Sequence, residues 1–246
     1  VYYLITRWKE LGKINGKEYI VKTIVTTETI KTIAERNGVE IYDVYTGFKW
    51  IANVMRENEG KKNYIGGGEE SYGFLCEDFV RDKDAVSACV ILAEIAAWAK
   101  DQGLSLYQLL QKIYVEYGFS KEKGISVVKK GKSGAEEIEA MMKKFRENPL
   151  TEIAGSKVTY FYDYSTLKGK DYAENETVTL DMPTTSNVLQ YFTEDNTKVS
   201  IRPSGTEPKI KFYCEVHSKV KSIDELPEAE KAAEEKINQI KASLGI

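Results

Sequence analysis

The 246-residue sequence predicts an α/β protein, with a parallel-sheet α/β/α domain over residues 1–120 and a smaller α+β domain over residues 121–246 whose sheet is mainly antiparallel. In the first part, runs of β-branched residues alternate with apolar residues at helical spacing, which is typical of parallel βαβ units. In the second part, strand-like runs follow one another between two helical segments, which favours an antiparallel sheet.

The elements of the first part follow from local signals. Thr27 is a suitable N-cap for the second helix, and Asn37-Gly38 ends it. The expected helices are 1–12, 28–37, 47–58, 84–100 and 105–117, and the expected strands are 19–25, 39–45 and 63–65. Helix 84–100 has a dense apolar face formed by Val86, Val90, Ala93 and Ala97. The first helix begins in apolar sequence with no N-cap before it, which we interpret as the start of a cut chain.

Residues 119–132 are rich in lysine and glycine, and the pattern changes there. We interpret them as a linker into the second domain, and a solvated loop inside one domain is the alternative. The elements expected beyond it are helices 134–147 and 228–243 and strands 125–128, 157–162, 187–192, 198–202 and 209–217. The last helix has acidic first turns and later lysines, an order that suits the helix dipole.

Composition excludes several classes of protein. A net charge of −3 gives no basis for an electrostatic nucleic-acid footprint, and no apolar run approaches the roughly 20 residues that span a bilayer. We therefore expect neither nucleic acid nor membrane as a partner. Cys76, Cys89 and Cys214 are widely spaced and are interpreted as reduced thiols of a cytoplasmic protein. His217 is the only histidine, so neither a Cys/His zinc site nor a Ser-His-Asp triad is easily built.

The sharpest motif is Arg-Pro-Ser-Gly-Thr-Glu-Pro-Lys at 202–209, between two strand patterns. Arg202 offers a planar fork for a phosphate, and Ser204 and Thr206 add hydroxyl donors. Gly205 lets backbone N–H groups turn inward as an anion-binding nest. The alternative is an ordinary hairpin connection with solvated charges, and the residues alone give both interpretations about equal weight.

Three further motifs are weaker when taken singly. Gly-Gly-Gly-Glu-Glu-Ser-Tyr-Gly at 66–73 follows a strand and could present a carboxylate and a hydroxyl to sugar hydroxyls, or be a flexible loop. In the motif 46–50, Lys49 lies in the first turn of a predicted helix, where the helix dipole favours negative charge. A bound anion nearby would explain a lysine at this position, and an exposed lysine with no ligand is the alternative. In 81–84, Asp82 and Asp84 suit a helix N-terminus, and no third ligand supports a metal.

The motifs TGFKW, GEESYG followed by RDKDA, and RPSGTEPKIKFY occur here in that order. In this combination, and over essentially its whole length, the chain resembles the C-terminal half of a member of the α-D-phosphohexomutase family, nearer the phosphoglucomutase branch. The resemblance implies a third domain with a sugar-specificity loop and a fourth, C-terminal domain with a phosphate-binding loop. The residues it places on phosphate are Arg202, Ser204, Gly205, Thr206 and Lys49.

The resemblance also implies a sugar site and a catalytic residue. The residues it places on the sugar are Glu69, Ser71, Thr46 and Gly47. Lys83 matches an active-site lysine of phosphoglucomutases, with a role in proton transfer or charge stabilisation. The implied substrate is a phosphorylated hexose: the enzyme would interconvert glucose 1-phosphate and glucose 6-phosphate through a phosphoserine and a bisphosphorylated sugar.

Two motifs of the family have no counterpart in this sequence. The phosphoserine loop resembling T-A-S-H-N-P and the metal loop resembling D-G-D-x-D-R are both missing. The resemblance therefore implies that Mg²⁺ is held by N-terminal domains that this chain lacks, that those domains are its partners, and that glucose 1,6-bisphosphate is an activator. We expect this chain alone to be inactive. A phosphomannomutase or phosphoglucosamine mutase fragment, or a non-catalytic sugar-phosphate binding module, remain alternatives.

Overall fold

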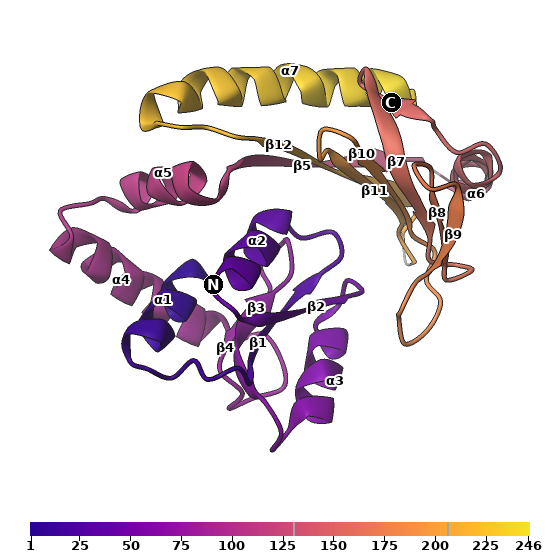
Figure 1. The fold of residues 1–246 in the computed structure, drawn as a ribbon. Helices are drawn as coiled ribbons and strands as arrows, with labels where there is room; N and C mark the ends of the chain where they lie inside the picture. Colours follow the sequence, from indigo (N-terminus) through magenta and orange to yellow (C-terminus); the bar gives the residue numbers. More distant parts are fainter. Residues whose placement is uncertain (130, 206) are drawn as a thin grey trace. The chain divides into compact units, whose positions relative to one another are not determined.

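The computed structural model describes residues 1–129, 131–205 and 207–246. They divide into two compact units, Val1–Gly118 and Phe119–Ile246 (Figure 1). Unit 1 contains a four-stranded sheet and unit 2 an eight-stranded sheet. None of the helices in the described part of the chain has the length and apolar character of a bilayer-crossing segment.

Unit 1 is an α/β layer structure. Its helices are α1 (Tyr2–Glu10), α2 (Glu28–Arg36), α3 (Phe48–Asn58), α4 (Ala85–Asp101) and α5 (Leu106–Tyr117), and its strands are β1 (Glu18–Thr23), β2 (Glu40–Val44), β3 (Asn63–Gly68) and β4 (Phe74–Cys76). The strand order is β2-β1-β3-β4, with β1 parallel to β2 and β3 and with β4 antiparallel to β3. The mostly parallel sheet confirms the predicted class, and the three-residue β4 was not predicted.

The two faces of this sheet carry separate apolar clusters, because successive side chains of a strand point to opposite faces. Ile20 packs with residues of α1 and α2, and Tyr19 and Val21 pack with residues of α3. The strands lie close together at β3: a Cβ on Gly67 would be 2.0 Å from the carbonyl oxygen of Val21. Only glycine fits at position 67, and the three glycines 66–68 are residues of β3.

Unit 2 is built on an antiparallel sheet. Its helices are α6 (Gly131–Glu147) and α7 (Leu226–Leu244), preceded by a 3₁₀ turn η1 (Ile223–Glu225). Its strands are β5 (Phe119–Val128), β6 (Glu152–Ile153), β7 (Ser156–Asp163), β8 (Lys168–Asp171), β9 (Glu176–Thr179), β10 (Leu189–Thr193), β11 (Lys198–Pro203) and β12 (Lys209–Ser218). The order is β5-β12-β11-β10-β7-β8-β9, and β6 pairs with β7. The predicted antiparallel α+β class is confirmed.

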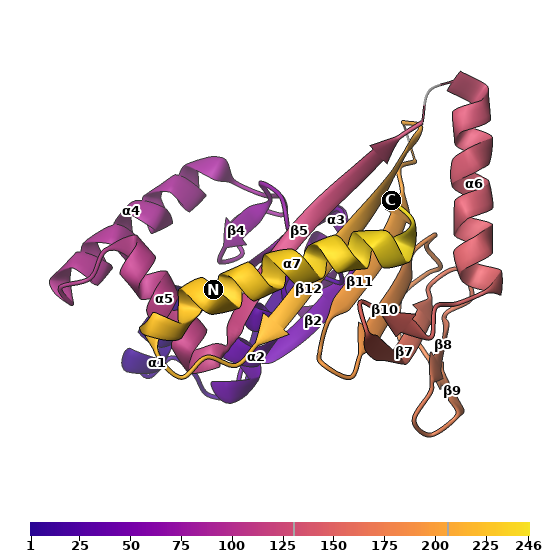
Figure 2. The same cartoon turned by 90° about the horizontal axis from the view of Figure 1, so that it is seen from above.

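Helices α6 and α7 supply the apolar cover of this sheet. Figure 2 shows α7 lying along β5 and β12, on which it packs. In β12, alternate residues Ile210, Phe212, Cys214 and Val216 are buried. The ring of Phe145 in α6 lies 6.3 Å from that of Phe212, and Tyr191 donates a hydrogen bond to the Phe145 carbonyl oxygen at 3.0 Å. These contacts hold α6 beside the loop that joins β11 to β12.

Two expectations were wrong. The lysine- and glycine-rich stretch is not a linker, because 119–128 forms β5 and pairs with the whole of β12, from Phe119 opposite Ser218 to Val128 opposite Lys209. β5 is an edge strand, where lysines are common because they discourage further pairing. The apolar face predicted for helix 84–100 is also not the packed one: Val86 and Val90 are exposed, and Ile91, Ile95 and Trp98 pack on the core instead.

Candidate functional site

The predicted sugar-binding residues lie in loops that leave the carboxyl ends of the parallel strands. β1, β2 and β3 end at Thr23, Val44 and Gly68, at the same edge of the sheet. In open α/β sheets this edge is the usual place for a ligand. The loop after β2 continues into α3, and the loop after β3 turns back into β4.

The structure brings two of the predicted loops into contact. The Gly47 N–H donates a hydrogen bond to Oε2 of Glu69 at 2.8 Å. Gly47 has φ of +120°, a conformation that favours glycine. The Glu69 N–H in turn donates to the Gly73 carbonyl oxygen at 2.7 Å, and a Cβ on Gly73 would lie 2.8 Å from Oε1 of Glu69. The carboxylate is therefore half-buried and fixed between the two loops.

Two lysines lie beside the loop that contains Thr46 and Gly47. Nζ of Lys83 is 5.9 Å from the ring centroid of Phe48 and 3.2 Å from a carboxylate oxygen of Asp82. Lys49 is exposed, with its Nζ 5.1 Å from the ring centroid of Trp50. Lys83 lies two residues before the start of α4, and Lys49 lies in the first turn of α3. The fold therefore places two cations beside the half-buried loop of Thr46 and Gly47.

Ser71 lies at the tip of the loop after β3. It is exposed, and Tyr72 next to it is fully exposed with φ of +56°, which is uncommon for a residue other than glycine. The loop tip therefore projects from the fixed carboxylate of Glu69 into solvent. Its sequence position predicted a ligand loop, but its backbone conformation was not predictable.

Sequence reasoning missed a buried lysine beneath these loops. The Lys22 side chain is fully buried, with Nζ 2.6 Å from a carboxylate oxygen of Asp43 and 3.0 Å from one of Glu28. The neighbouring Thr23 hydroxyl donates to Glu70 at 3.2 Å. Buried charges persist only when they are paired, and Lys22 interrupts the run 19–25, in which Thr23 is the one other polar residue. That interruption was the signal in the sequence.

The predicted phosphate loop lies in unit 2, between β11 and β12. Arg202 is half-buried on β11 opposite Lys211, and the Ser204 N–H donates to the Lys209 carbonyl oxygen at 2.8 Å. The Ser204 Oγ accepts from the Glu207 N–H at 3.3 Å. Around Gly205 an added Cβ would meet no atom within 4 Å. Thr206, also predicted to bind phosphate, lies outside the described residues.

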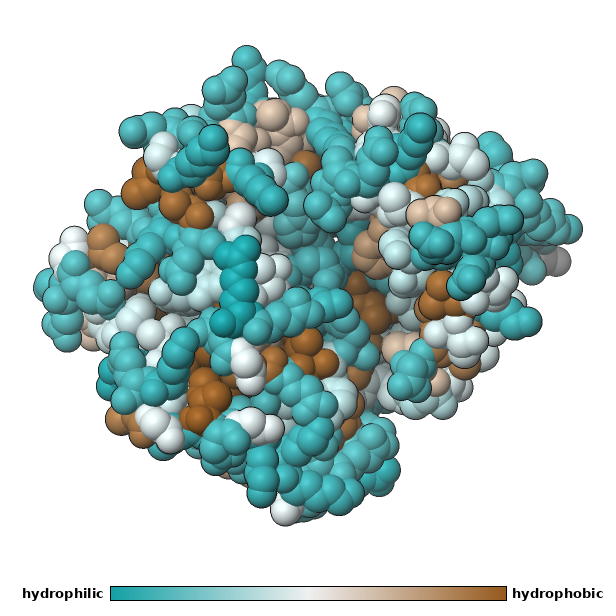
Figure 3. Space-filling view, viewed as in Figure 1, coloured by the Kyte–Doolittle hydropathy of each residue, from teal (hydrophilic) through white to brown (hydrophobic). Residues whose placement is uncertain are grey.

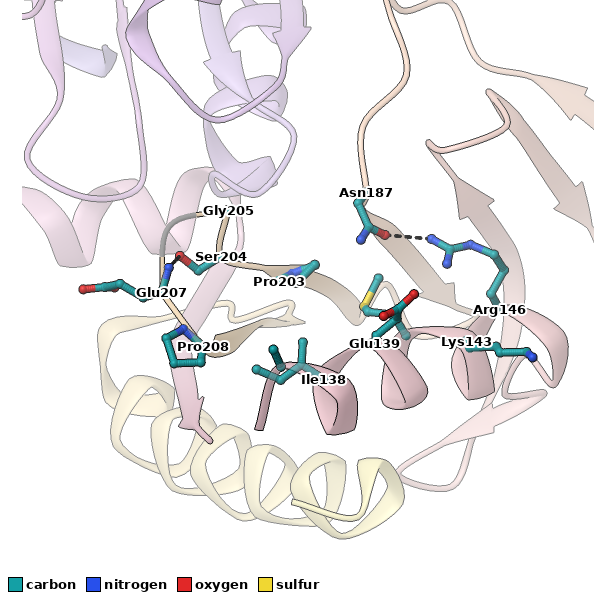
Figure 4. A pocket seen from close by; sticks show the side chains of 12 residues that line it. Ile138, Glu139, Lys143, Arg146, Asn187, Pro203, Ser204, Gly205, Glu207 and Pro208 are labelled. Carbon is teal, nitrogen blue, oxygen red and sulfur yellow. Dashed lines mark hydrogen bonds between the residues drawn. The ribbon is translucent and has the colours of Figure 1, made fainter. Parts of the chain in front are cut away.

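A groove of about 600 Å³ separates this loop from α6 (Figure 4). Pro203, Ser204, Gly205 and Pro208 line one side, and α6 lines the other. Arg146 of α6 donates from Nε to Asp163 at 2.9 Å and from Nη2 to Asn187 at 2.8 Å. This arginine is therefore held in place at the wall of the groove, next to Asn187 and away from the loop residues Ser204 and Gly205 (Figure 4).

The carboxylates of unit 1 do not form a metal site. Asp84 caps α4 by accepting hydrogen bonds from the N–H groups of Val86 and Ser87, and the bonds from Ser87 hold the pKa of Asp84 below its ordinary value. Asp82 is paired with Lys83. Within residues 1–129, 131–205 and 207–246, no three His, Cys, Asp or Glu side chains are grouped so that they could hold a metal ion. The residues present therefore do not fit Mg²⁺.

The chain thus combines an α/β unit, with the predicted sugar-site loops at its strand ends, and an antiparallel unit, with an arginine- and serine-bearing loop between β11 and β12. The family model described as phosphoglucomutase/phosphomannomutase, alpha/beta/alpha domain III, matches residues 1–117. The model of the C-terminal domain of the same family matches residues 126–233. The chain therefore belongs to the phosphoglucomutase/phosphomannomutase family.

Curated relatives agree with this membership. The chain is 35% identical to a phosphoglucomutase of Staphylococcus haemolyticus over 214 residues, covering 87% of this chain and 39% of the relative. It is 40% identical to one of Staphylococcus aureus over 194 residues, covering 79% of this chain and 35% of the relative. The chain thus spans less than half of the length of the curated relatives it matches.

Solved structures support the fold. A phosphoglucomutase/phosphomannomutase family protein of Burkholderia thailandensis aligns with a TM-score of 0.56 at 16% identity, covering 99% of this chain and 41% of that one. The exocytosis-sensitive phosphoprotein parafusin of Paramecium aligns with a TM-score of 0.55 at 19% identity, covering 82% and 33%.

Proposed function

We propose that this chain is the substrate-binding C-terminal part of a phosphoglucomutase, which interconverts glucose 1-phosphate and glucose 6-phosphate. The observation that carries the proposal is the hydrogen bond from Gly47 to Glu69, which joins two sugar-site loops at the strand ends of unit 1. Two relatives named phosphoglucomutase, 35% and 40% identical, support the choice of reaction.

In this proposal residues 1–120 form the third domain, which holds the sugar. Oε2 of Glu69 is engaged by Gly47, so Oε1 is the oxygen that accepts from sugar hydroxyls. Ser71 and Thr46 add hydroxyl groups that donate or accept. A rigid carboxylate suits sugar discrimination, because little side-chain freedom is lost on binding.

Residues 121–246 form the C-terminal domain, which holds the phosphate that is not reacting. Arg202 binds it through its planar fork, and Ser204, Gly205 and Thr206 donate from hydroxyl and backbone groups. Lys49, in unit 1, is proposed as a further phosphate-binding residue. One fixed clamp serves both substrate orientations, since the bisphosphorylated intermediate turns around between the two transfers.

Lys83 is the candidate catalytic residue, because it lies beside the sugar-site loop and carries no buried structural role: its side chain is half exposed. It would supply a proton or offset charge as the phosphoryl group moves. The phosphoryl donor and Mg²⁺ would belong to a region of the parent polypeptide outside these residues, and glucose 1,6-bisphosphate would serve as activator.

The test compares rates on three substrates with the polypeptide encoded by the complete reading frame. We expect glucose 1-phosphate to be converted faster than mannose 1-phosphate or glucosamine 1-phosphate. Preference for either of the other two sugars would make the chain part of a phosphomannomutase or a phosphoglucosamine mutase. Binding of all three sugar phosphates without conversion would indicate a binding module.

A further inference from the structure

Tyr72, at the tip of the loop after β3, is the most exposed large hydrophobic residue in the described chain. It is 104% exposed, and Val86 follows at 74%. Figure 3 shows that the surface on the side seen in Figure 1 is mostly hydrophilic, with hydrophobic residues in separate patches. A single exposed aromatic residue is not by itself the sign of a ligand contact, so the backbone of Tyr72 and its neighbours carry the argument.

The backbone of Tyr72 has a conformation that disfavours its side chain. Its φ is +56°, in the left-handed region, and among the described residues it is the one aromatic residue with positive φ. Glycine takes this conformation without strain. The stability of the fold therefore does not account for a tyrosine at this position, and residues held in such conformations cluster at ligand sites.

The loop that presents Tyr72 is fixed at its base. The Glu69 N–H donates to the Gly73 carbonyl oxygen at 2.7 Å. The carboxylates of Glu69 and Glu70 each accept a hydrogen bond from a group outside the loop, at 2.8 and 3.2 Å. Ser71 and Tyr72 are the exposed residues of the tip. The ring is thus presented from an anchored loop rather than from a free one.

The ring also lies close to the proposed sugar-binding oxygen. A Cβ on Gly73 would be 2.8 Å from Oε1 of Glu69, the oxygen that we assign to the sugar hydroxyls. The Cα of Tyr72 is about 3.8 Å from that of Gly73, as in any two consecutive residues. A sugar bound at Oε1 is therefore within reach of the Tyr72 ring. Because the ring is fully exposed, no packing contact has to be broken when it turns onto the sugar.

We infer that Tyr72 is a specificity-determining residue whose ring stacks on a C–H face of the bound hexose; this inference rests on the proposed function. In the chair form of glucose the hydroxyls on C2, C3 and C4 are equatorial, so both faces of the ring present C–H bonds there. The electron-rich face of an aromatic ring attracts such hydrogens. Mannose carries an axial hydroxyl on C2, which prevents an aromatic ring from lying flat on that face.

Stacking also suits a substrate that turns around between the two transfers. A hydrogen bond requires a particular hydroxyl at a particular place, as at Glu69. A flat aromatic face has no such requirement and accepts either orientation of the sugar. Tyr72 would therefore hold the hexose in both orientations and favour sugars without an axial hydroxyl.

The experiment measures affinity by isothermal titration in the polypeptide of the complete reading frame. Tyr72→Gly removes the ring and suits the positive φ, and Tyr72→Phe keeps the ring. We expect Tyr72→Gly to weaken binding of glucose 1-phosphate roughly 10-fold and Tyr72→Phe to leave it nearly unchanged. Binding of mannose 1-phosphate should weaken less. Binding of inorganic phosphate, which has no C–H face, should not change in either variant.

Two controls separate a contact with the sugar from a structural role. Tyr107 on α5 is also an exposed tyrosine of unit 1, at 66%, and Tyr107→Ala should change none of these affinities. Without ligand, Tyr72→Gly should not lower the melting temperature, because glycine tolerates this conformation.

The outcomes separate this inference from the proposed function, because affinity can be measured without turnover. Ring-dependent affinity for glucose 1-phosphate in a polypeptide that converts no hexose phosphate supports the stacking and counts against the function. Conversion of glucose 1-phosphate together with unchanged affinity in Tyr72→Gly overturns the inference and leaves the function standing. Equal losses for glucose 1-phosphate and either mannose 1-phosphate or inorganic phosphate would also overturn it, as would a lower melting temperature of Tyr72→Gly without ligand.

Discussion

Replacing Glu69 by glutamine tests the sugar-reading role at the level of single atoms. The variant keeps the shape of the side chain but substitutes an N–H₂ donor for one carboxylate oxygen and removes the charge. Oε2 already accepts from the Gly47 N–H at 2.8 Å, so the amide oxygen must either keep that bond or serve the sugar. Either choice leaves the Gly47 N–H or a sugar hydroxyl without its acceptor oxygen.

The size of the effect follows from the hydrogen bonds involved. A bond to a charged group contributes about 1.5–3 kcal/mol and a neutral one about 0.5–1.5 kcal/mol, so neutralising the acceptor costs about 1 kcal/mol per bond. If Glu69 accepts from two sugar hydroxyls, the loss is about 2 kcal/mol, or roughly 30-fold in kcat/KM for glucose 1-phosphate.

The assay compares kcat/KM for glucose 1-phosphate and mannose 1-phosphate in the complete polypeptide, together with the affinity for inorganic phosphate. We expect Glu69→Gln to change the ratio between the sugars and to leave phosphate affinity nearly unchanged. Glu35→Gln, on the exposed side of α2, is the control and should change neither. If phosphate affinity fell as much as sugar selectivity, Glu69 would not be the sugar reader.

Three further outcomes are expected. Arg202→Ala should weaken binding of glucose 1-phosphate by on the order of 1.5–3 kcal/mol in isothermal titration of the complete polypeptide, without changing its melting temperature. Unchanged affinity would mean that the loop 202–209 is an ordinary hairpin connection and not a phosphate site. Gly67→Ala should lower the free energy of unfolding by about 1–3 kcal/mol or more, because its Cβ meets the Val21 carbonyl oxygen, whereas Gly124→Ala in open space should be near neutral in urea unfolding; equal effects would contradict the packing. Burial alone would raise the pKa of Glu215, but Lys198 and His217 hold this pKa well below its ordinary value. The stability that Glu215 contributes is therefore present above about pH 4 and is lost as the pH falls below that. Glu215→Gln should make the free energy of unfolding less dependent on pH in this acid range, and an unchanged dependence would refute the pairing.

Local patterns predicted most elements because their signals lie within a few residues. The Thr27 cap and the Asn37-Gly38 stop placed α2 to within one residue of its observed ends. The hairpin of β8 and β9 was missed, since Lys168–Asp171 and Glu176–Thr179 are short and polar and lack an alternating pattern. Within β5, residues 125–128 were predicted as a strand, but 119–124 were taken for part of a linker because their composition is that of a loop, and they form a strand by pairing with β12.

The site was predictable as motifs but not as geometry. The sequence placed Gly47 and Glu69 in two loops that each follow a predicted strand, and the structure adds that the two loops meet and which carboxylate oxygen is engaged. Lys22 was missed because its partners Asp43 and Glu28 are separated in the sequence and meet only in the folded sheet. The exposed side of α4 was not predictable, because an apolar helix gives no internal sign of which face packs.

The most direct measurement of the central claim is conversion of glucose 1-phosphate to glucose 6-phosphate, with Mg²⁺ and glucose 1,6-bisphosphate present. Phosphoryl transfer needs a donor in line with the acceptor and a cation to offset charge. No described group of carboxylates in this chain could hold that cation. We expect the polypeptide of the complete reading frame to turn over and the 246-residue chain to show no conversion while still binding the substrate weakly. Turnover by the 246-residue chain at a rate near that of the longer polypeptide would contradict the account.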